Sequence, residues 1–462
     1  MKPMQFEQRH FVMTPVIVPE GKKSTITIRG LGNFHQFFDD LDYQVRIIPK
    51  EQRDYLINDD FDIAKFNEEC NIIDAKCENG VLTFEYTFTG EQEWCIALRT
   101  KNGEEDYLKY YNPWRVMFKD LWRLPGWENF RYDFRLYSLS RDLYELTPFK
   151  GDTHTHTDYS DGTDTPELFC AHYRGFGYDF AAITDHYEYR GSIRAVEKMK
   201  QLDTNFKVFL GEEVHVIPSG GHYHIVNFGG KSSVNERIIS DYDNVKKEVF
   251  EAAKEYTHLA ERDAQELAWI KWISDHIRQV GGLCICAHPF DTVYNAYNIP
   301  TNITYESIKR GYYDAYEILN CSAQGKNIQA MFYYDLQGQG IKIPIVGSTD
   351  AHHSTDHGEG SAAIHSTVVF AKTIEDVPEA IKNMMTTAVS HEPDQKPYVH
   401  GSFKLAKYTC FLMENYFPMH NELCMASSVL QREYFKGSTE LKPAIELAEK
   451  RIKEYTDTFF GR

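Results

Sequence analysis

The first third of the chain alternates apolar and polar residues over short stretches. Segments rich in β-branched and aromatic residues, many bounded by Gly, Asn or Pro, lie at 12–18, 24–30, 43–49, 81–88, 93–100 and 132–139. Successive side chains of a strand point to opposite faces, so this alternation is typical of strands with one buried face. The pattern predicts an antiparallel β-sandwich-like domain over residues 1–147.

From residue 148 the pattern changes to short apolar runs separated by helical stretches. The runs lie at 180–186, 206–214, 223–229, 282–290, 315–320 and 342–352, and each contains or ends in polar or ionisable residues. Repeated alternation of strand and helix predicts an α/β fold with a parallel sheet or barrel, here over residues 148–395. Active sites of such folds lie at the carboxyl ends of the strands.

Two helical segments accompany this region. Residues 231–280 read as a long helical insertion, which is either a lid over the mouth of the fold or a peripheral helix buried against it. Residues 396–462 are predicted to form a C-terminal helical cap packed on the barrel.

Composition excludes several classes of protein. Lys+Arg is 50 and Asp+Glu is 68 in 462 residues, a net charge of −18, which disfavours nucleic acid and anionic membranes as partners. There is no run of about 18 apolar residues, so no membrane span is expected. The nine cysteines are scattered and form no C-x-x-C pair, which favours reduced thiols and a cytoplasmic location.

An aromatic stretch at 107–137 leaves two interpretations open. It holds eleven aromatic residues with six Lys and Arg residues interleaved. Such a stretch can be a stacking platform for sugars or bases. It can equally be part of a core together with a contact surface for the next domain.

Histidine is concentrated in the middle of the chain. Sixteen of the 19 histidines lie between 151 and 400. His154 and His156 form an H-x-H at a predicted strand end, where side chains two residues apart share a face. Other ionisable residues border further apolar runs: Asp161, Asp185, His186, Glu212, Glu213, His222, His224, His288, Asp350, His352 and His353. So many ionisable groups at one mouth would be repulsive or costly without cations, which predicts a multinuclear metal site.

The motifs HTHTDYSDG, ITDH, GEEV, HYHIVNFG, CAHPF and GSTDAHH, in this order, resemble those of the PHP (polymerase and histidinol phosphatase) superfamily. The resemblance covers roughly residues 148–395. It implies a distorted (β/α)7, TIM-like barrel with two or three divalent transition metals, commonly zinc, manganese or iron. It also implies hydrolysis of a phosphoester.

The resemblance further implies a trinuclear ligand set. The first metal takes His154, His156 and Asp350, with Glu213 bridging; the second shares Glu213 and adds His224 and His288; the third takes Asp161, His186 and His352. The G-x-E register selects Glu213 over Glu212, and we expect one of these two carboxylates to face solvent.

The expected chemistry is attack on phosphorus by a hydroxide that bridges two ions about 3.5–4 Å apart. Glu213 and Asp350 are the candidate catalytic ligands, and His215 is a candidate general acid. Arg190, Arg194 and Lys326 are candidate substrate-binding cations.

The sequence therefore predicts a metal-dependent phosphoesterase that acts on a small phosphorylated metabolite. Within enzymes, a nuclease or a phosphatase acting on protein or polysaccharide-pathway phosphate is the alternative. A carbohydrate-binding protein with a secondary barrel is the alternative from another class. The oligomeric state is left open.

Overall fold

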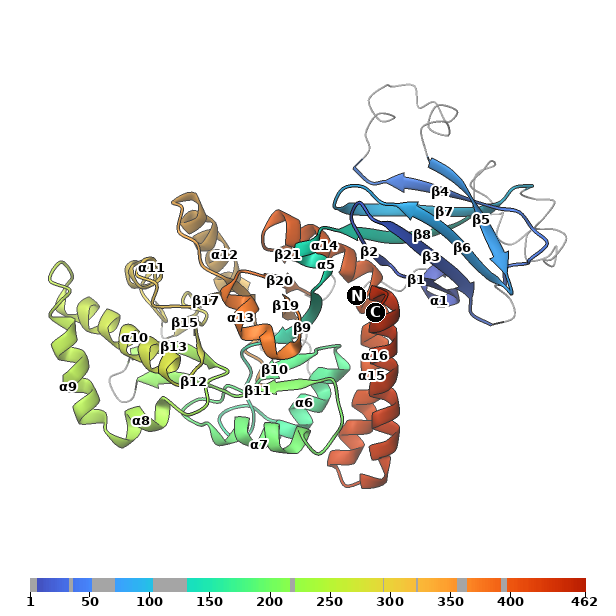
Figure 1. Ribbon diagram of the computed structural model, residues 1–462. Coiled ribbons are helices and arrows are strands. Elements are labelled where there is room, and N and C mark those ends of the chain that lie inside the picture. The colour runs from blue at the N-terminus through green and yellow to red at the C-terminus, as the bar shows by residue number, and fades with distance from the viewer. Residues whose placement is uncertain are drawn as a thin grey trace. The chain divides into compact units, whose positions relative to one another are not determined.

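The computed structural model describes residues 6–32, 36–51, 71–102, 131–216, 221–293, 295–320, 323–354, 364–391 and 397–462 (Figure 1). The chain forms two compact units. One comprises residues 146–410 and 420–452, and the other comprises residues 2–145, 411–419 and 453–462. The predicted three-part division at residues 147 and 395 stays a prediction.

The N-terminal unit contains an eight-stranded sheet in the order β1-β3-β6-β5-β4-β7-β8-β2. Its strands are β1 (Phe11–Thr14), β2 (Ile17–Pro19), β3 (Lys23–Gly30), β4 (Tyr43–Pro49), β5 (Asn71–Glu78), β6 (Val81–Thr87), β7 (Gln92–Thr100) and β8 (Arg131–Leu139), with short helices α1 (Phe6–His10) and α5 (Arg141–Tyr144). Among the described strands of this eight-stranded sheet, only β2 and β8 pair in parallel. All six predicted strand segments are strands, while the sandwich itself stays a prediction.

Aromatic rings fill the interior of this unit. Phe11 of β1 packs edge-on against Phe134 of β8, with ring centroids 5.6 Å apart, although these strands are far apart in the strand order. Trp94 is buried and donates its indole N–H to Ser138 Oγ at 2.8 Å. Of the aromatic stretch, residues 107–130 lie outside the described residues, whereas Phe134 and Tyr137 are buried. The described end of the stretch thus belongs to the core.

The second unit contains two larger sheets. The six-stranded sheet runs β11-β10-β9-β19-β20-β21 and the five-stranded sheet β12-β13-β14-β17-β18. The strands are β9 (Thr147–Asp152), β10 (Phe180–Ala182), β11 (Lys207–Phe209), β12 (Gly211–Val216), β13 (Gly221–Phe228), β14 (Leu283–Cys286), β17 (Ala315–Leu319), β18 (Ile345–Gly347), β19 (His365–Ala371), β20 (Thr386–Ser390) and β21 (Tyr398–His400), with a hairpin of β15 (Thr292–Val293) and β16 (Ala296–Tyr297). Parallel bridges Thr155↔Ala351 and His186↔Glu213 join the two sheets.

The arrangement is a mixed α/β fold, and it is less parallel than the sequence pattern predicts. β9, β10 and β11 are parallel to one another, as are β14, β17 and β18. β12, β13 and β14 instead pair antiparallel. Only four residues separate β12 from β13, which is too few for a crossover helix. The closed (β/α)7 barrel stays a prediction.

The second unit contains the helices α6 (Pro166–Gly175), α7 (Arg190–Met199), α8 (Asn235–Ser240), α9 (Tyr242–Ala253), α10 (Glu261–Gln279), α11 (Thr301–Lys309), α12 (Ala323–Gly338) and α13 (Val377–Lys382), and most of α14 (Phe403–Asn415), α15 (Phe417–Phe435) and α16 (Lys442–Phe460). The predicted insertion forms α8, α9 and α10. Leu267 and Ile270 of α10 are fully buried in one cluster with Ile225 and Cys286 of the sheet. This packing matches the peripheral-helix alternative for α10.

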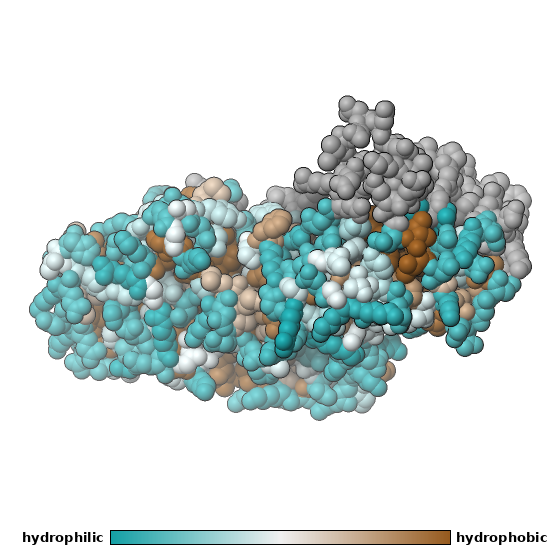
Figure 2. All heavy atoms as spheres, turned by 45° about the horizontal axis from the view of Figure 1, so that its top comes forward, coloured by the Kyte–Doolittle hydropathy of each residue, from teal (hydrophilic) through white to brown (hydrophobic). Residues whose placement is uncertain are grey.

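Polar residues cover most of the face that is shown in Figure 2. On the face shown in Figure 2, hydrophobic residues are gathered in a few separate patches. Among the described residues, no helix is both long enough and apolar enough to cross a bilayer. The seven described cysteines are free thiols.

A buried ion network ties α6 to α15 and α16 within the second unit. The guanidinium of Arg174, fully buried on α6, donates two hydrogen bonds to Glu449 at 3.1 and 2.8 Å. It also donates to Asp179 at 3.2 Å, and His420 Nε2 lies 3.1 Å from the same carboxylate oxygen. Buried charges are costly unless each has a partner, so loss of one member leaves another uncompensated.

Glu449→Ala should therefore lower the free energy of unfolding by about 3–5 kcal/mol. The matched control is Glu251→Ala, which removes an exposed partner of Lys254 and should cost at most about 1 kcal/mol. Urea denaturation followed by circular dichroism measures both. Equal effects of the two substitutions would contradict a structural role for this network.

His420 makes stability depend on pH in a defined window. Burial alone lowers its pKa, but interactions with Cys424 and Asp179 outweigh burial and raise the pKa to about 9. A raised pKa contributes stability that is complete below the unfolded value near 6.5 and is lost as the pH rises through the folded value. Between pH 6 and 9.5, the wild type should lose about 1–3 kcal/mol more than His420→Gln. If the wild type and His420→Gln gave parallel curves of unfolding free energy against pH, a contribution of His420 to this pH dependence would be ruled out.

Candidate metal centre

The carboxyl ends of several strands bring the predicted ligands together. His154 and His156 follow β9, His186 follows β10, and His288 follows β14. The remaining members lie on β12 (Glu213), on β13 (His224), in the segment after His156 (Asp161) and after β18 (Asp350 and His352). Residues distant in sequence thus meet where the bridges Thr155↔Ala351 and His186↔Glu213 join the two sheets.

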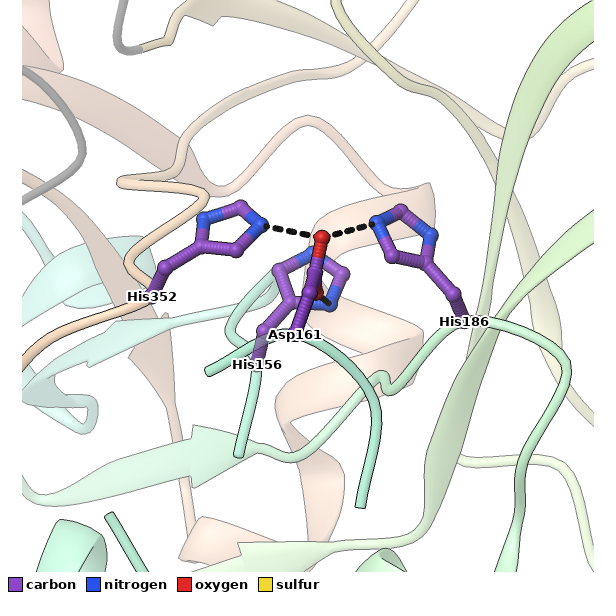
Figure 3. A group of neighbouring side chains, drawn as sticks. All are labelled: His156, Asp161, His186 and His352. Carbon is purple, nitrogen blue, oxygen red and sulfur yellow. Dashed lines mark ion pairs between the residues drawn. The ribbon is translucent and has the colours of Figure 1, made fainter. Parts of the chain in front are cut away.

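One group contains His156, Asp161, His186 and His352 (Figure 3). One ligand atom from each lies within 4.8 Å of all the others. Asp161 is at the middle: its Oδ2 lies 3.3 Å from His352 Nε2 and 3.5 Å from His186 Nε2. Its Oδ1 lies 3.9 Å from His156 Nδ1. The carboxylate therefore faces three imidazoles from separate segments.

A second group contains His154, Glu213, His288 and Asp350, all buried. His154 Nε2 lies 3.3 Å from Glu213 Oε2 and 3.2 Å from Asp350 Oδ1. His288 Nε2 lies 3.3 Å from Glu213 Oε1 and 3.5 Å from Asp350 Oδ2. Two imidazoles and two carboxylates thus point at one small volume.

A third group contains His186, Glu213 and His215. His186 Nδ1 lies 2.8 Å from Glu213 Oε2 and 2.7 Å from His215 Nε2. His224 Nδ1, which belongs to none of the three groups, lies 2.7 Å from Glu213 Oε1. Glu213 is thereby shared, as a bridging ligand must be.

The three groups overlap with the predicted ligand sets, and the assignment of ligands to individual metals stays a prediction. His156 Nε2 lies 3.2 Å from His154 Nε2, 3.4 Å from Glu213 Oε2 and 2.8 Å from Asp350 Oδ1, the other three residues of the first predicted set, while its Nδ1 faces the Asp161 group. His215, expected as a general acid, lies inside the third group. The imidazole of His156 has two nitrogens on opposite sides, so it stands between two groups.

Glu317 is a member of the site that the sequence interpretation missed. This fully buried carboxylate of β17 lies 2.9 Å from His154 Nδ1 and accepts the His288 backbone N–H at 3.0 Å. A partner on Nδ1 leaves Nε2 of His154 free to face Glu213. A signal was present, because a lone Glu interrupts the apolar run AYEIL.

Other neighbours fix the remaining side chains. Asn298 Nδ2 lies 2.8 Å from His288 Nδ1, which leaves Nε2 of that imidazole toward the group. Asp185 accepts the Thr157 N–H at 2.6 Å and the Ser160 hydroxyl at 2.9 Å. These bonds hold the segment that carries Asp161.

Glu212 and Glu213 point to different environments, and both are fully buried. The expectation that one of them faces solvent is wrong. Glu212 accepts hydrogen bonds from Asn227 Nδ2 at 3.0 Å, the Ser233 hydroxyl at 2.6 Å and the Val234 N–H at 2.6 Å. The start of the helical insertion covers Glu212, a contact between segments that the local sequence pattern does not encode.

The electrostatics of the centre favour a cation. Burial alone raises the pKa of Glu213, but His224, His154 and His186 outweigh it and hold the pKa well below its usual value. Burial lowers the pKa of His224 to about 3 despite Glu213. Both Glu213 oxygens, His224 Nδ1, His288 Nε2 and His156 Nδ1 are buried without a hydrogen bond. Lone pairs that face one another in this way fit a metal ion, and nitrogen and oxygen donors suit Zn, Mn or Fe(II).

Backbone strain is concentrated at the same place. Asp350 has φ +53°, His288 φ +22° and Tyr187, next to His186, φ +55°. Non-glycine residues in this region cost about 1–3 kcal/mol each and persist where surrounding structure imposes them. The strain is consistent with a functional site.

Two of the three predicted substrate-binding cations are already paired with carboxylates. Arg190, at the start of α7, donates to Glu188 Oε1 at 2.9 Å, and Arg194 donates to Glu167 Oε1 at 2.7 Å. The side chain of Lys326, a residue of α12, lies outside the described residues. Contact of these three residues with substrate stays a prediction.

Substitution at the two neighbouring glutamates should separate metal binding from folding. Glu213→Gln should lose bound metal with little change in unfolding free energy, because the amide removes the shared charge. Glu212→Gln should keep its metal but lose about 1–3 kcal/mol, because its amide N–H₂ meets donors. Elemental analysis and urea denaturation of both variants check this. An exchange of the two phenotypes would show that the register is wrong.

Comparison with known proteins identifies the domain that contains most of this site. The PHP domain model matches residues 152–318, and Asp350 and His352 lie beyond it. DNA polymerase/3'-5' exonuclease PolX of Bacillus subtilis is 32% identical over 96 residues, a match that spans 18% of this chain and 17% of that protein.

Two solved structures are similar at a lower level. A two-domain protein containing a predicted PHP-like metal-dependent phosphoesterase from Bacteroides vulgatus has a TM-score of 0.40 and 17% identity, covering 59% of this chain and 71% of that one. An amidohydrolase from Chromobacterium violaceum has a TM-score of 0.31 and 16% identity, covering 45% and 89%. The domain model and the ordered ligand motifs are sufficient: the chain carries a PHP domain, at residues 152–318.

Proposed function

We propose that the protein is a metal-dependent phosphoester hydrolase that acts on a small phosphorylated metabolite. The PHP domain supports a hydrolase. The observation that carries the proposal is one buried carboxylate, Glu213, shared by two of the three groups of ligand atoms. Two or three divalent ions bound there would supply an activated water and positive charge for the phosphate oxygens.

The chain's own residues hold and orient that centre. Glu317 and Asn298 fix the rings of His154 and His288 through their Nδ1 atoms. Asp185 fixes the segment before Asp161 through Thr157 and Ser160. We propose that the nine predicted ligands hold the ions, with His215 as a further ligand from its place in the third group.

The net negative charge of the chain favours a small substrate over a polymeric one. A net charge of −18 disfavours approach of polymeric nucleic acid, so a small phosphorylated metabolite fits better than a nuclease substrate. The carbohydrate-binding alternative depends on the aromatic stretch 107–137, of which residues 107–130 lie outside the described residues.

Metal-depleted protein should be inactive and should regain turnover with Zn²⁺, Mn²⁺ or Fe²⁺ across a panel of phosphorylated metabolites. Inorganic phosphate should inhibit competitively, because its oxygens bind the same ions. Steady-state kinetics measures both. Metal-independent turnover, or no turnover with any phosphoester after full reconstitution, would contradict the proposal.

The variants Arg190→Ala and Arg194→Ala test whether a cationic side chain binds the substrate phosphate in addition to the metals. Loss of a charge-assisted hydrogen bond to the substrate raises KM by about tenfold or more. Both guanidinium groups are already paired, Arg190 with Glu188 and Arg194 with Glu167, but the side chain of Arg190 is 75% exposed and that of Arg194 37%, so we expect the larger KM effect at Arg190. Unchanged KM in both variants would leave phosphate recognition to the metals.

A further inference from the structure

A groove of about 430 Å³ lies between the β15–β16 hairpin, the start of α11 and one side of α12. Its lining consists of Phe290, Tyr297, Thr301, Asn327, Ile328, Met331, Phe332 and Asp335. Most of this lining is aromatic or aliphatic. A concave apolar surface with a few polar groups is the usual form of a small-molecule site.

Three rings form a rigid wall. Phe290 is 2% exposed, and its ring packs edge-on against Tyr297 at 5.4 Å and Phe332 at 5.0 Å between centroids. Met331 is 63% exposed and Tyr297 43% exposed, although both are apolar enough to gain from burial. The groove therefore offers uncovered apolar surface on a preformed support.

One buried segment of the chain joins the groove to the metal centre. Phe290 follows His288 by two residues, so their Cα atoms are at most about 7 Å apart. Tyr297 is adjacent to Asn298, the residue whose amide lies 2.8 Å from His288 Nδ1. The Ile299 N–H donates to the Pro289 carbonyl at 3.0 Å and closes this segment on itself. One short segment thus presents both a candidate ligand and two walls of the groove.

The charge at the rim limits what the groove accepts. Its one ionisable lining residue is Asp335, an exposed carboxylate on α12, and no Lys or Arg lines it. A second phosphate or carboxylate on the substrate would be repelled there. A flat, uncharged ring matches the aromatic walls and Met331.

We propose that this groove is a substrate subsite that receives an uncharged aromatic ring in the alcohol part of the phosphoester, while the phosphate binds at the metal centre. The proposal rests on the proposed function. It makes the substrate class an aromatic phosphomonoester rather than a sugar phosphate or a bisphosphate.

Non-hydrolysable phosphonates test the proposal by binding instead of turnover. The full-length, metal-reconstituted protein is titrated by calorimetry with 2-phenylethylphosphonate and with ethylphosphonate, which differ only in the ring. The ring should lower Kd by roughly tenfold, the gain expected from partial burial of a phenyl group. In Met331→Ala, and more strongly in Met331→Asp, this preference should fall to about twofold or less while the Kd of ethylphosphonate stays unchanged.

Met425→Ala is the matched control, because Met425 is 45% exposed on α15 and does not line the groove. It should keep the full preference for the ring. Equal Kd values for the two phosphonates in the wild type would overturn the subsite and leave the phosphoesterase intact. If neither phosphonate binds, the proposed function is overturned, and the subsite with it.

Discussion

The structure of the second unit is organised around the burial of one carboxylate, Glu213, among imidazoles. Its side chain is fully buried on β12, and both of its oxygens lack a hydrogen bond. Burying a carboxylate is costly unless positive charge from its neighbours or a bound cation compensates it. The strand ends that surround it contribute nitrogen and oxygen donors, so the fold assembles the environment in which a divalent ion offsets that cost.

Residues outside the ligand set hold the candidate ligands in position. Glu317 lies against His154 and also accepts the backbone N–H of His288, so one carboxylate couples two ligands. Glu212 binds the first residues of the insertion and thereby anchors the strand that carries Glu213. The positive φ angles of His288 and Asp350 show that the backbone is held in place against its local preference.

Side-chain alternation and apolar runs predicted many of the strands, but the fully buried strands β19 and β20 were not among the predicted segments. β5 escaped prediction because most of its residues are exposed or only half-buried, which leaves little periodicity. The antiparallel pairing of β12, β13 and β14 was not predictable from apolar runs alone, since a buried run is compatible with either direction. At the site, the nine ligands implied by the family resemblance stay a prediction; the structure places eight of them in the three groups and His224 beside Glu213. The local pattern could not reveal that Glu212 is covered by Ser233 and Val234, or that His156 stands between two groups.

The central claim is that the clustered side chains hold metal ions at the three groups of ligand atoms, two of which share Glu213. Anomalous diffraction from crystals of reconstituted protein, recorded on both sides of the metal's absorption edge, tests it most directly. The account predicts two or three strong peaks, with Glu213 oxygens adjacent to at least two of them. Peaks confined to surface histidines, or no peak beside Glu213 in fully reconstituted protein, would contradict it.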